Sequence, residues 1–288
     1  MRQIQAPYKT ADALRDVLEH YRCYLSRNSD LADHCTQFLK REKSDPKAAQ
    51  AEAVVFSWLW AEKLRPCLFE DAGTGGPDYC CTHSGGRRFL VEATSLDSEA
   101  VSERSGLPAE ITGPGGGAFS LITEKLKDKA RSKASQLGGR GVPTVLAITS
   151  DHAFASLLMD KLAAEYLMTS APQLNVPIGG RAPSYITHDF KDSVFQRNTG
   201  LVWASGAPIV KPALRSIGAI LLVGVDHRNM RIVGLLHPDA ANPFNPEWLP
   251  MIPFVRFTGL VTFTSDCTEW LQVVEGDRVA TFPHRHLR

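Results

Sequence analysis

Apolar side chains recur at helical spacing near the start of the chain. In residues 8–43 the apolar positions lie three or four apart on a polar background, which predicts amphipathic helix. Asp45-Pro46 then has the composition of a helix start, because Pro is favoured in the first helical turn. The following segment, residues 46–64, is apolar nearly all round, so we expect a helix that is buried on most sides.

Short runs of strand-forming residues follow this helix, at residues 67–71, 78–82 and 88–94. The Gly85-Gly86 turn between the second and third runs predicts an antiparallel hairpin. Residues 98–117 are rich in Gly, Ser and Glu and predict a long loop, which we expect to be mobile and to border any site on the hairpin.

The rest of the chain alternates between helical and strand-like patterns. Helices are predicted over residues 118–137 and 153–167, and strands over residues 142–149, 217–225, 230–236 and within 254–282, whereas residues 170–212 give no clear assignment. The order of helix, strands, helix, strand and helix in the middle of the chain predicts an α/β fold with a mixed sheet.

Length and composition are those of a globular protein, with 288 residues, 43% of them hydrophobic and 22% charged, and a formal net charge of +1. That charge excludes a histone-like polycation but is compatible with a local basic patch. No apolar run approaches the roughly 18 residues needed to span a membrane, and residues 1–8 lack the apolar core of a signal peptide. We therefore expect a cytoplasmic protein that does not enter the membrane.

Common nucleotide-binding and hydrolase motifs are missing from the sequence. It contains no phosphate-binding P-loop, no G-x-G-x-x-G fingerprint, no G-x-S-x-G elbow and no H-E-x-x-H. The six cysteines include no C-x-x-C pair, so the sequence predicts no structural zinc site. With these motifs absent, a metal site built from oxygen ligands is the strongest functional indication left in the sequence.

Two acidic residues lie on the predicted hairpin. Asp78 follows Gly76-Pro77 at the start of one strand, and 13 residues separate it from Glu92 on the next strand. The hairpin brings both carboxylates to one end of the sheet, with the carbonyl of Ala93 between them. These are hard oxygen ligands suited to Mg²⁺, and a shared ion with Mg–O bonds near 2.1 Å requires the carboxylates to lie about 4 to 5 Å apart. Such an ion activates water for attack on a phosphodiester.

Pro77-Asp78 followed by Glu92-Ala93-Thr94 resembles the motif of the PD-(D/E)XK nuclease superfamily. The resemblance covers residues 46–150, and residues 217–241 resemble the extra strands and His-Pro-x-Ala turn of some uncharacterised members. It implies a restriction-endonuclease-like fold, a mixed β-sheet flanked by helices. It also implies a nuclease whose metal, Mg²⁺ or Mn²⁺, is held by Asp78, Glu92 and the carbonyl of Ala93.

One position departs from the family. Thr94 stands where the family has the lysine that orients the attacking water, two positions after the second acid. Two interpretations follow, either an inactive site or a lysine supplied from elsewhere. In some members the lysine has migrated to the following helix, so the resemblance directs attention to residues 118–137.

A helical wheel at about 100° per residue separates the lysines of that helix. Lys133 falls inside the apolar stripe, and Lys129 and Gln136 fall on its margin. Lys127, Asp128 and Arg131 fall opposite and are expected in solvent. Because a buried ammonium without a partner costs several kcal/mol, on the order quoted for single buried ions, Lys133 needs an acid, and Asp78 or Glu92 would supply it. We favour the migrated lysine, with Lys129 as substitute and Gln136 in support.

Glu52 gives a similar but softer signal. It lies among apolar residues of the predicted helix 46–64, and the resemblance would make it a further active-site acid. Each candidate also has an ordinary structural interpretation: Glu52 could pair with Lys63 or Arg65, Asp78 could be a turn residue, and Glu92 could face solvent. Lys133 could extend from the edge of its helix into water.

Basic residues flank the proposed site: Lys125, Lys129, Lys133 and Arg140, with Arg87 and Arg88 on the hairpin. Phosphate contacts dominate nucleic-acid affinity, so this flank suits a nucleic-acid backbone, although a solvated lysine-rich helix would look the same. No recognition helix or zinc finger is present to read bases.

We therefore predict a helical N-terminal extension, residues 1–45, and a nuclease-like α/β domain, residues 46–288, with a β-rich C-terminal elaboration. The predicted function is a Mg²⁺-dependent phosphodiester hydrolase acting on nucleic acid, with DNA as the expected substrate. The alternative is an inactive nuclease-fold protein that binds nucleic acid or protein. The sequence leaves a homodimer open.

Overall fold

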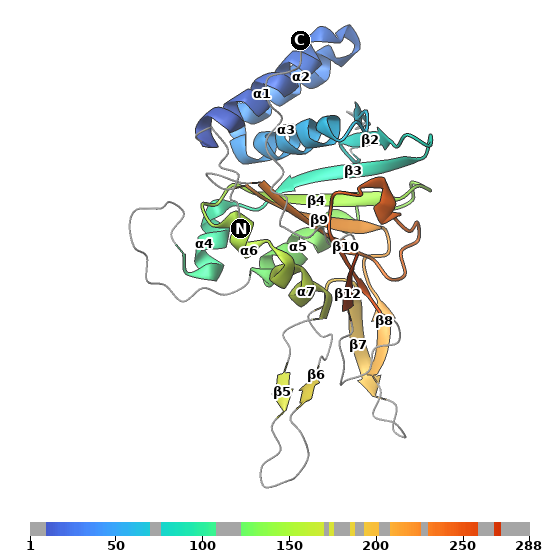
Figure 1. The fold of residues 1–288 in the computed structure, drawn as a ribbon. Coiled ribbons are helices and arrows are strands. Elements are labelled where there is room, and N and C mark those ends of the chain that lie inside the picture. Colours follow the sequence, from blue (N-terminus) through green and yellow to red (C-terminus); the bar gives the residue numbers. More distant parts are fainter. Residues whose placement is uncertain are drawn as a thin grey trace.

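A computed structural model describes most of the chain. The described residues are 10–69, 76–107, 122–169, 173–175, 185–187, 193–201, 208–225, 230–258 and 268–271. Their main feature is an eight-stranded mixed sheet with the strand order β1-β2-β3-β4-β9-β10-β11-β12 (Figure 1). Its strands are β1 (Cys67–Leu68), β2 (Tyr79–Thr82), β3 (Arg88–Ser95), β4 (Thr144–Ser150), β9 (Ala219–Val225), β10 (Met230–Leu236), β11 (Phe254–Phe257) and β12 (Thr268–Leu271).

The sheet combines antiparallel and parallel pairs. β1, β2 and β3 run antiparallel, β3, β4 and β9 run parallel, and β10 returns antiparallel to β9. β11 pairs parallel to β10 and antiparallel to β12. This confirms the predicted α/β class with a mixed sheet, and it confirms the predicted hairpin of β2 and β3.

Three N-terminal helices cover one face of the sheet: α1 (Thr10–Arg27), α2 (Ala32–Ser44) and α3 (Pro46–Ala61). The helical pattern of residues 8–43 is interrupted at Asn28, which has extended backbone angles and precedes the 3-10 turn η1 (Ser29–Leu31). The predicted start of α3 is confirmed, because the Asp45 side chain accepts a hydrogen bond from the Ala48 N–H at 3.1 Å and Pro46 is the first helical residue.

α3 lies directly against the sheet, with α1 and α2 packed on its outer side (Figure 1). This sandwiched position explains why its sequence is apolar nearly all round, as predicted. Trp60, in its last turn, is an exposed large apolar residue of α3, at 38% exposure.

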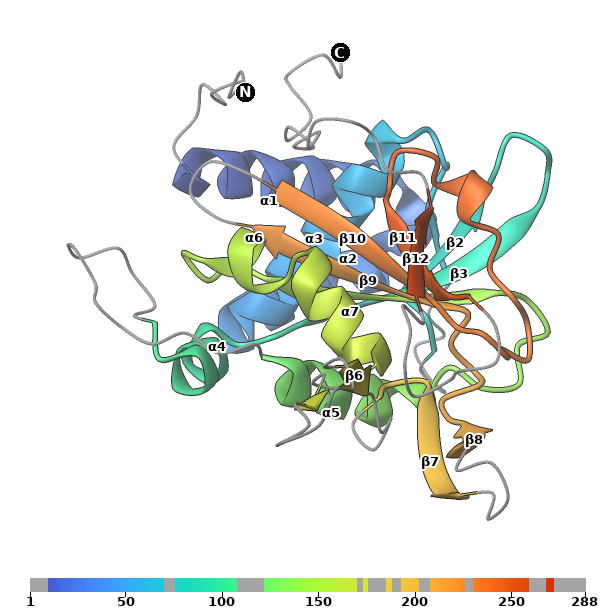
Figure 2. The same ribbon diagram turned by 60° about the horizontal axis from the view of Figure 1, so that its bottom comes forward.

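The opposite face carries α4 (Ser98–Ser105), α5 (Thr123–Ala134), α6 (Ala155–Leu158) and α7 (Lys161–Thr169) (Figure 2). The loop predicted over residues 98–117 is wrong in its first half, since α4 forms there and ends at Gly106, whose left-handed φ of 72° suits a helix end. Residues 108–121 lie outside the described part. The single helix predicted over residues 153–167 is divided between α6 and α7 at Met159 and Asp160.

Residues 170–212, which gave no clear assignment, contribute two small hairpins outside the main sheet. They are β5 (Gln173–Asn175) with β6 (Tyr185–Thr187), and β7 (Gln196–Leu201) with β8 (Pro208–Pro212). Among the described helices, none has the length and apolar character needed to cross a membrane.

Alternate side chains of the central strands enter two separate hydrophobic clusters. Val91 and Ala147 belong to the cluster beneath α1 to α3, whereas Leu146 and Ile148 belong to the cluster with α5 and α7. Both faces of the central strands are therefore covered, and the buried polar side chains of β3, Glu92 and Thr94, lie within the strand.

Candidate active site

The β2–β3 hairpin places the two predicted acids opposite each other. A turn with a His83 N–H to Arg87 carbonyl bond of 2.9 Å closes the hairpin, and Gly86 in it has a φ of 74°. The register pairs Tyr79 with Val91, so the next position along pairs Asp78 with Glu92. The backbone positions of the two acids are therefore adjacent at the open end of the hairpin.

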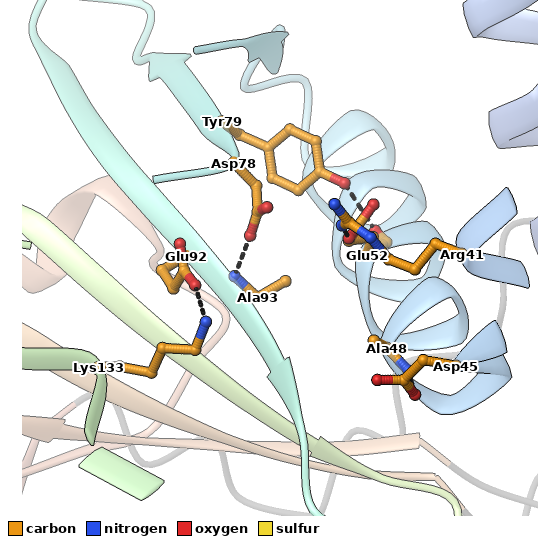
Figure 3. Close-up of polar contacts among 9 residues, drawn as sticks. All are labelled: Arg41, Asp45, Ala48, Glu52, Asp78, Tyr79, Glu92, Ala93 and Lys133. Atoms are coloured by element: carbon orange, nitrogen blue, oxygen red, sulfur yellow. Dashed lines mark hydrogen bonds and ion pairs between the residues drawn. The ribbon is translucent and has the colours of Figure 1, made fainter. Parts of the chain in front are cut away.

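Asp78 is buried at 8% exposure and is fixed by the backbone of β3. Its Oδ2 atom accepts a hydrogen bond of 2.6 Å from the Ala93 N–H, the peptide that directly follows Glu92 (Figure 3). In an extended strand the N–H and C=O of one residue point to the same side. The Ala93 carbonyl therefore faces the Asp78 side, as the proposed ligand set requires.

Glu92 is paired with a lysine of α5, which lies on the face of the sheet toward which the Glu92 side chain projects. Its side chain is 5% exposed, and its Oε1 atom accepts a hydrogen bond of 2.6 Å from the Lys133 ammonium on α5 (Figure 3). The predicted contact between Lys133 and an acid of the hairpin is thus confirmed, while its catalytic role stays a prediction. Lys133 retains 26% side-chain exposure, so the ammonium lies at the border between core and solvent.

The two supporting candidates, Lys129 and Gln136, are not part of the contact between Lys133 and Glu92. Lys129 is half-buried on α5, and Gln136 is exposed in the turn that follows α5. Within the described residues, no ion pair joins Lys129 to either acid and no hydrogen bond joins the Gln136 side chain to them. Lys133 is therefore the lysine that the structure brings to the hairpin.

Two other residues of the motif region are buried. Thr94, at the family's lysine position, is 7% exposed, and its carbonyl accepts a bond of 3.3 Å from the Thr149 hydroxyl. Lys127 was expected in solvent, and this expectation is wrong, because it is only 5% exposed. α5 packs against α4 and α7 as well as β4, so a second side of the helix is covered. Asp128 and Arg131, on the remaining side, are exposed as expected.

Glu52 is buried and forms an ion pair with Arg41 of α2 (Figure 3). The structural alternative expected for it, a pair with Lys63 or Arg65, is therefore wrong; the partner comes from the neighbouring helix. The backbone carbonyl of Glu52 also accepts a 3.0 Å bond from the Tyr79 hydroxyl.

Asp78 and the Arg41–Glu52 pair share one electrostatic neighbourhood. Burial raises the pKa of Tyr79 well above its usual value, the Asp78 carboxylate raises it further, and the Arg41 guanidinium opposes the shift. The same three causes act on the pKa of Tyr21. Glu52 thus lies near the hairpin, but its carboxylate is already neutralised by Arg41.

The basic flank is partly neutralised. Lys125 pairs with Glu103 at 3.4 Å and Lys133 pairs with Glu92, while Arg87, Arg88 and Arg140 are exposed. The exposed positive charge of this flank is therefore carried by Arg87 and Arg88 at the hairpin turn and by Arg140 in the loop after α5, rather than by Lys125 and Lys133.

The donor set fits a hard divalent cation. Among the described residues no group of three or more His, Cys, Asp or Glu side chains could hold a metal ion. A site at Asp78 and Glu92 would therefore use two carboxylates and the Ala93 carbonyl, all oxygen donors, with water and substrate oxygens completing the coordination. Mg²⁺ in proteins is commonly bound in this way, through few carboxylates.

A small pocket lies elsewhere, where the parallel strands β3 and β4 end beneath α3. Its charged residues are satisfied by one another, because Asp151 pairs with Lys47 and accepts a 2.9 Å bond from the Ser98 hydroxyl. The acids of the hairpin do not line it.

Comparisons of the chain with protein-family models, with curated proteins and with solved structures gave no match. The resemblance to the PD-(D/E)XK superfamily therefore rests on this chain's own motif residues.

Sequence reasoning missed one residue beside the acids, Phe69. β1 pairs Leu68 with Tyr79, so Phe69 lies opposite Asp78, and its N–H donates a 2.9 Å bond to the Asp78 carbonyl. The available signal was its place in the strand-like run of residues 67–71, two strands away from Glu92.

Proposed function

We propose that this protein is a metal-dependent phosphodiester hydrolase acting on nucleic acid, with DNA as the expected substrate. One observation carries the proposal: Asp78, hydrogen-bonded to the Glu92–Ala93 peptide, lies opposite Glu92, which is itself paired with Lys133. Two acids on adjacent strands, a backbone carbonyl and an ammonium paired with one of the acids are groups that can hold a metal ion and stabilise charge on a phosphodiester.

The surrounding elements support the same proposal. The chain runs from α3 through the antiparallel strands β1, β2 and β3, then through α5 to β4, which pairs parallel to β3. This is the order that the resemblance to restriction-endonuclease-like proteins implies, with the acids on β2 and β3.

Each residue of the constellation has a distinct role in the proposal. Asp78, Glu92 and the Ala93 carbonyl would hold Mg²⁺ or Mn²⁺, which when bound supplies Lewis-acid activation of water and stabilises charge on the phosphate. The Ala93 N–H fixes the Asp78 carboxylate in place. The Lys133 ammonium orients the nucleophilic water and offsets negative charge, the task that Thr94 cannot perform because it carries no charge.

Thr94 also supports a second candidate. An inactive nuclease-fold protein that binds nucleic acid or protein would tolerate loss of the motif lysine, and Thr94 is buried in the sheet rather than directed at solvent. In that case the Lys133–Glu92 pair would only stabilise the docking of α5.

Cleavage assays distinguish the two candidates. The purified chain is incubated with plasmid, single-stranded DNA, duplex DNA and RNA in Mg²⁺, in Mn²⁺ and in EDTA. Cleavage that requires the cation and falls about 10³-fold in Asp78→Asn and Glu92→Gln supports the hydrolase. Asp128→Asn, an exposed acid of α5, is the matched control and should leave the rate unchanged.

Equal activity of the wild type and both variants, or activity that persists in EDTA, would overturn the hydrolase. Retained binding of nucleic acid without cleavage under any of these conditions would favour the inactive binding protein.

A further inference from the structure

The row of opposed residues that contains the two acids continues to the edge of the sheet. The registers place Phe69 of the β1 end opposite Asp78, and Asp78 opposite Glu92. An aromatic residue, an acid and a second acid therefore follow one another along a row of opposed backbone positions. The ring occupies the outer end of this row, where the sheet ends.

Phe69 is an exposed aromatic residue, with 42% of its surface accessible. Single exposed apolar residues are common on protein surfaces, so the exposure of this ring matters here only because of its neighbours. Its neighbour in the row is the proposed metal ligand Asp78 rather than another apolar residue, so packing within the sheet does not explain its position.

Arg140 covers part of this ring. Its guanidinium carbon lies 6.0 Å from the centroid of Phe69, within the range of a cation–π contact. Arg140 follows α5 in the loop that leads to β4, and its residue is exposed. Arg140 therefore holds a positive charge against the Phe69 ring, beside the acids. Its planar guanidinium can donate two parallel hydrogen bonds to phosphate oxygens.

Gly76 makes room for this arrangement. A β-carbon added to it would lie 2.8 Å from an Arg140 guanidinium nitrogen, and its φ of 145° is a conformation that side chains disfavour. The glycine two positions before Asp78 thus lets the guanidinium approach the backbone that carries the proposed metal ligand. The backbone segment that carries Asp78 therefore also lies against the Arg140 guanidinium.

We propose that Phe69 and Arg140 form a subsite for an unpaired nucleotide, and that single-stranded nucleic acid is the preferred substrate class of the site. This inference rests on the proposed function. The ring of Phe69 offers a stacking surface for a base, which tolerates any sequence because every base has a π-face. Arg140 binds the backbone phosphate of that nucleotide. In a duplex the faces of internal bases are stacked on their neighbours, so the ring has no base to receive.

Binding measured without metal tests the subsite separately from cleavage. Fluorescence anisotropy in EDTA compares a labelled single strand with the duplex of the same sequence. We expect the wild type to bind the single strand more tightly. Phe69→Ala should weaken single-strand binding about tenfold or more, with little change for the duplex, because base stacking is lost. Phe69→Trp should retain the preference.

Arg140→Ala should weaken binding to both forms and lower the slope of log affinity against log salt by about one, the signature of a lost phosphate contact. Leu162→Ala, an equally exposed apolar residue of α7, is the control for Phe69. Arg256→Ala, on β11 near the opposite edge of the sheet, is the control for Arg140. Circular dichroism and thermal melting confirm that each variant is folded.

The outcomes separate this inference from the proposed function. Cleavage that depends on Asp78 and Glu92 but shows no single-strand preference, or no effect of Phe69→Ala, overturns the subsite alone. A wild-type protein that binds and cleaves no nucleic acid overturns both. Weakening by Phe69→Ala that is equal for single strand and duplex also overturns the subsite, because it shows a general structural effect.

Discussion

Glu92 and Glu52 are buried carboxylates on apolar elements, and each is paired with a cation from a neighbouring helix. Their surroundings differ. Glu92 lies opposite a second acid, Asp78, and its partner Lys133 is a quarter exposed. Glu52 is held between helices by Arg41, while its backbone carbonyl is bonded to Tyr79. A buried charge therefore predicts an ion-pair partner, and what distinguishes Glu92 from Glu52 is the second acid on the adjacent strand.

The largest expected difference between the two pairs concerns cleavage. Glu92→Gln removes a charge proposed to hold the metal, so the cleavage rate should fall about 10³-fold. Glu52→Gln should leave the rate of the folded protein within about twofold, because Glu52 is held by Arg41 between the helices and is not among the proposed metal ligands. Rates are measured on a labelled oligonucleotide in Mg²⁺ below the melting temperature of each variant. A loss of similar size in Glu52→Gln would make Glu52 part of the site.

The next largest expected effect concerns the two lysines of α5, Lys133 and Lys129. Lys133→Ala should lower cleavage about 10²-fold, since the proposed water-orienting charge is lost, whereas Lys129→Ala should have no such effect. Single-turnover rates at saturating protein isolate the chemical step. Undiminished activity in Lys133→Ala would remove the migrated-lysine mechanism, and a loss confined to Lys129→Ala would transfer the role to that residue.

The free energy of unfolding tests the structural role of the Arg41–Glu52 pair. Arg41→Ala leaves the Glu52 carboxylate buried without its partner, which costs about 2 to 3 kcal/mol of unfolding free energy after allowance for the partial exposure of Arg41. The double variant Arg41→Met/Glu52→Met removes both charges and should recover much of that loss. Urea unfolding at pH 7 measures both. A double variant that is less stable than Arg41→Ala would show that the charged pair itself is favourable.

The smallest expected effect is a loss of stability at low pH, which comes from buried histidines outside the two ion pairs. Burial lowers the pKa of His20, His152 and His237 below the ordinary value of 6.5. His237 is fixed in the neutral form, because its Nε2–H donates to the Ala213 carbonyl at 2.6 Å and its Nδ1 accepts from the Asp239 N–H at 2.9 Å. In the unfolded chain the three imidazoles take up protons first.

The pH dependence follows from that difference in proton uptake. The stabilising contribution of the neutral histidines should be fully present above pH 6.5. The free energy of unfolding should then decline as the pH falls through 6.5 toward the lowered pKa values that the histidines have in the folded state. Urea unfolding free energies at several pH values between 8 and 5 measure this decline. His237→Gln should reduce the slope, although it also lowers the stability at neutral pH. Stability that rises on acidification would contradict the assignment of neutral buried histidines.

The sequence predicted the parts of the fold that depend on local pattern. The start of α3 at Asp45-Pro46, the β2–β3 hairpin and the strands β9 and β10 all follow from spacing within a few residues. The contact of Lys133 with an acid was also predictable, because an ammonium inside an apolar stripe requires a partner.

Features that depend on several neighbouring elements could not be predicted in this way. A helical wheel assumes one buried face, so it placed Lys127 in solvent, whereas α5 is covered by α4 and α7 as well as by the sheet. Arg41 as the partner of Glu52 depends on how α2 crosses α3. The position of Phe69 depends on the pairing of a two-residue strand. None of these leaves a periodic signal in the sequence.

The origin of the lysine has a consequence for how the protein folds. In a strand that carried both acid and lysine, the two charges would come together as soon as the hairpin formed. Here Glu92 and Lys133 are 41 residues apart, on different elements. Their pairing closes a long loop, and contacts of this kind slow folding because the loop entropy is lost before the contact forms. The charge balance of the candidate site is therefore completed by the docking of α5, so α5 packing and catalytic competence should be gained and lost together.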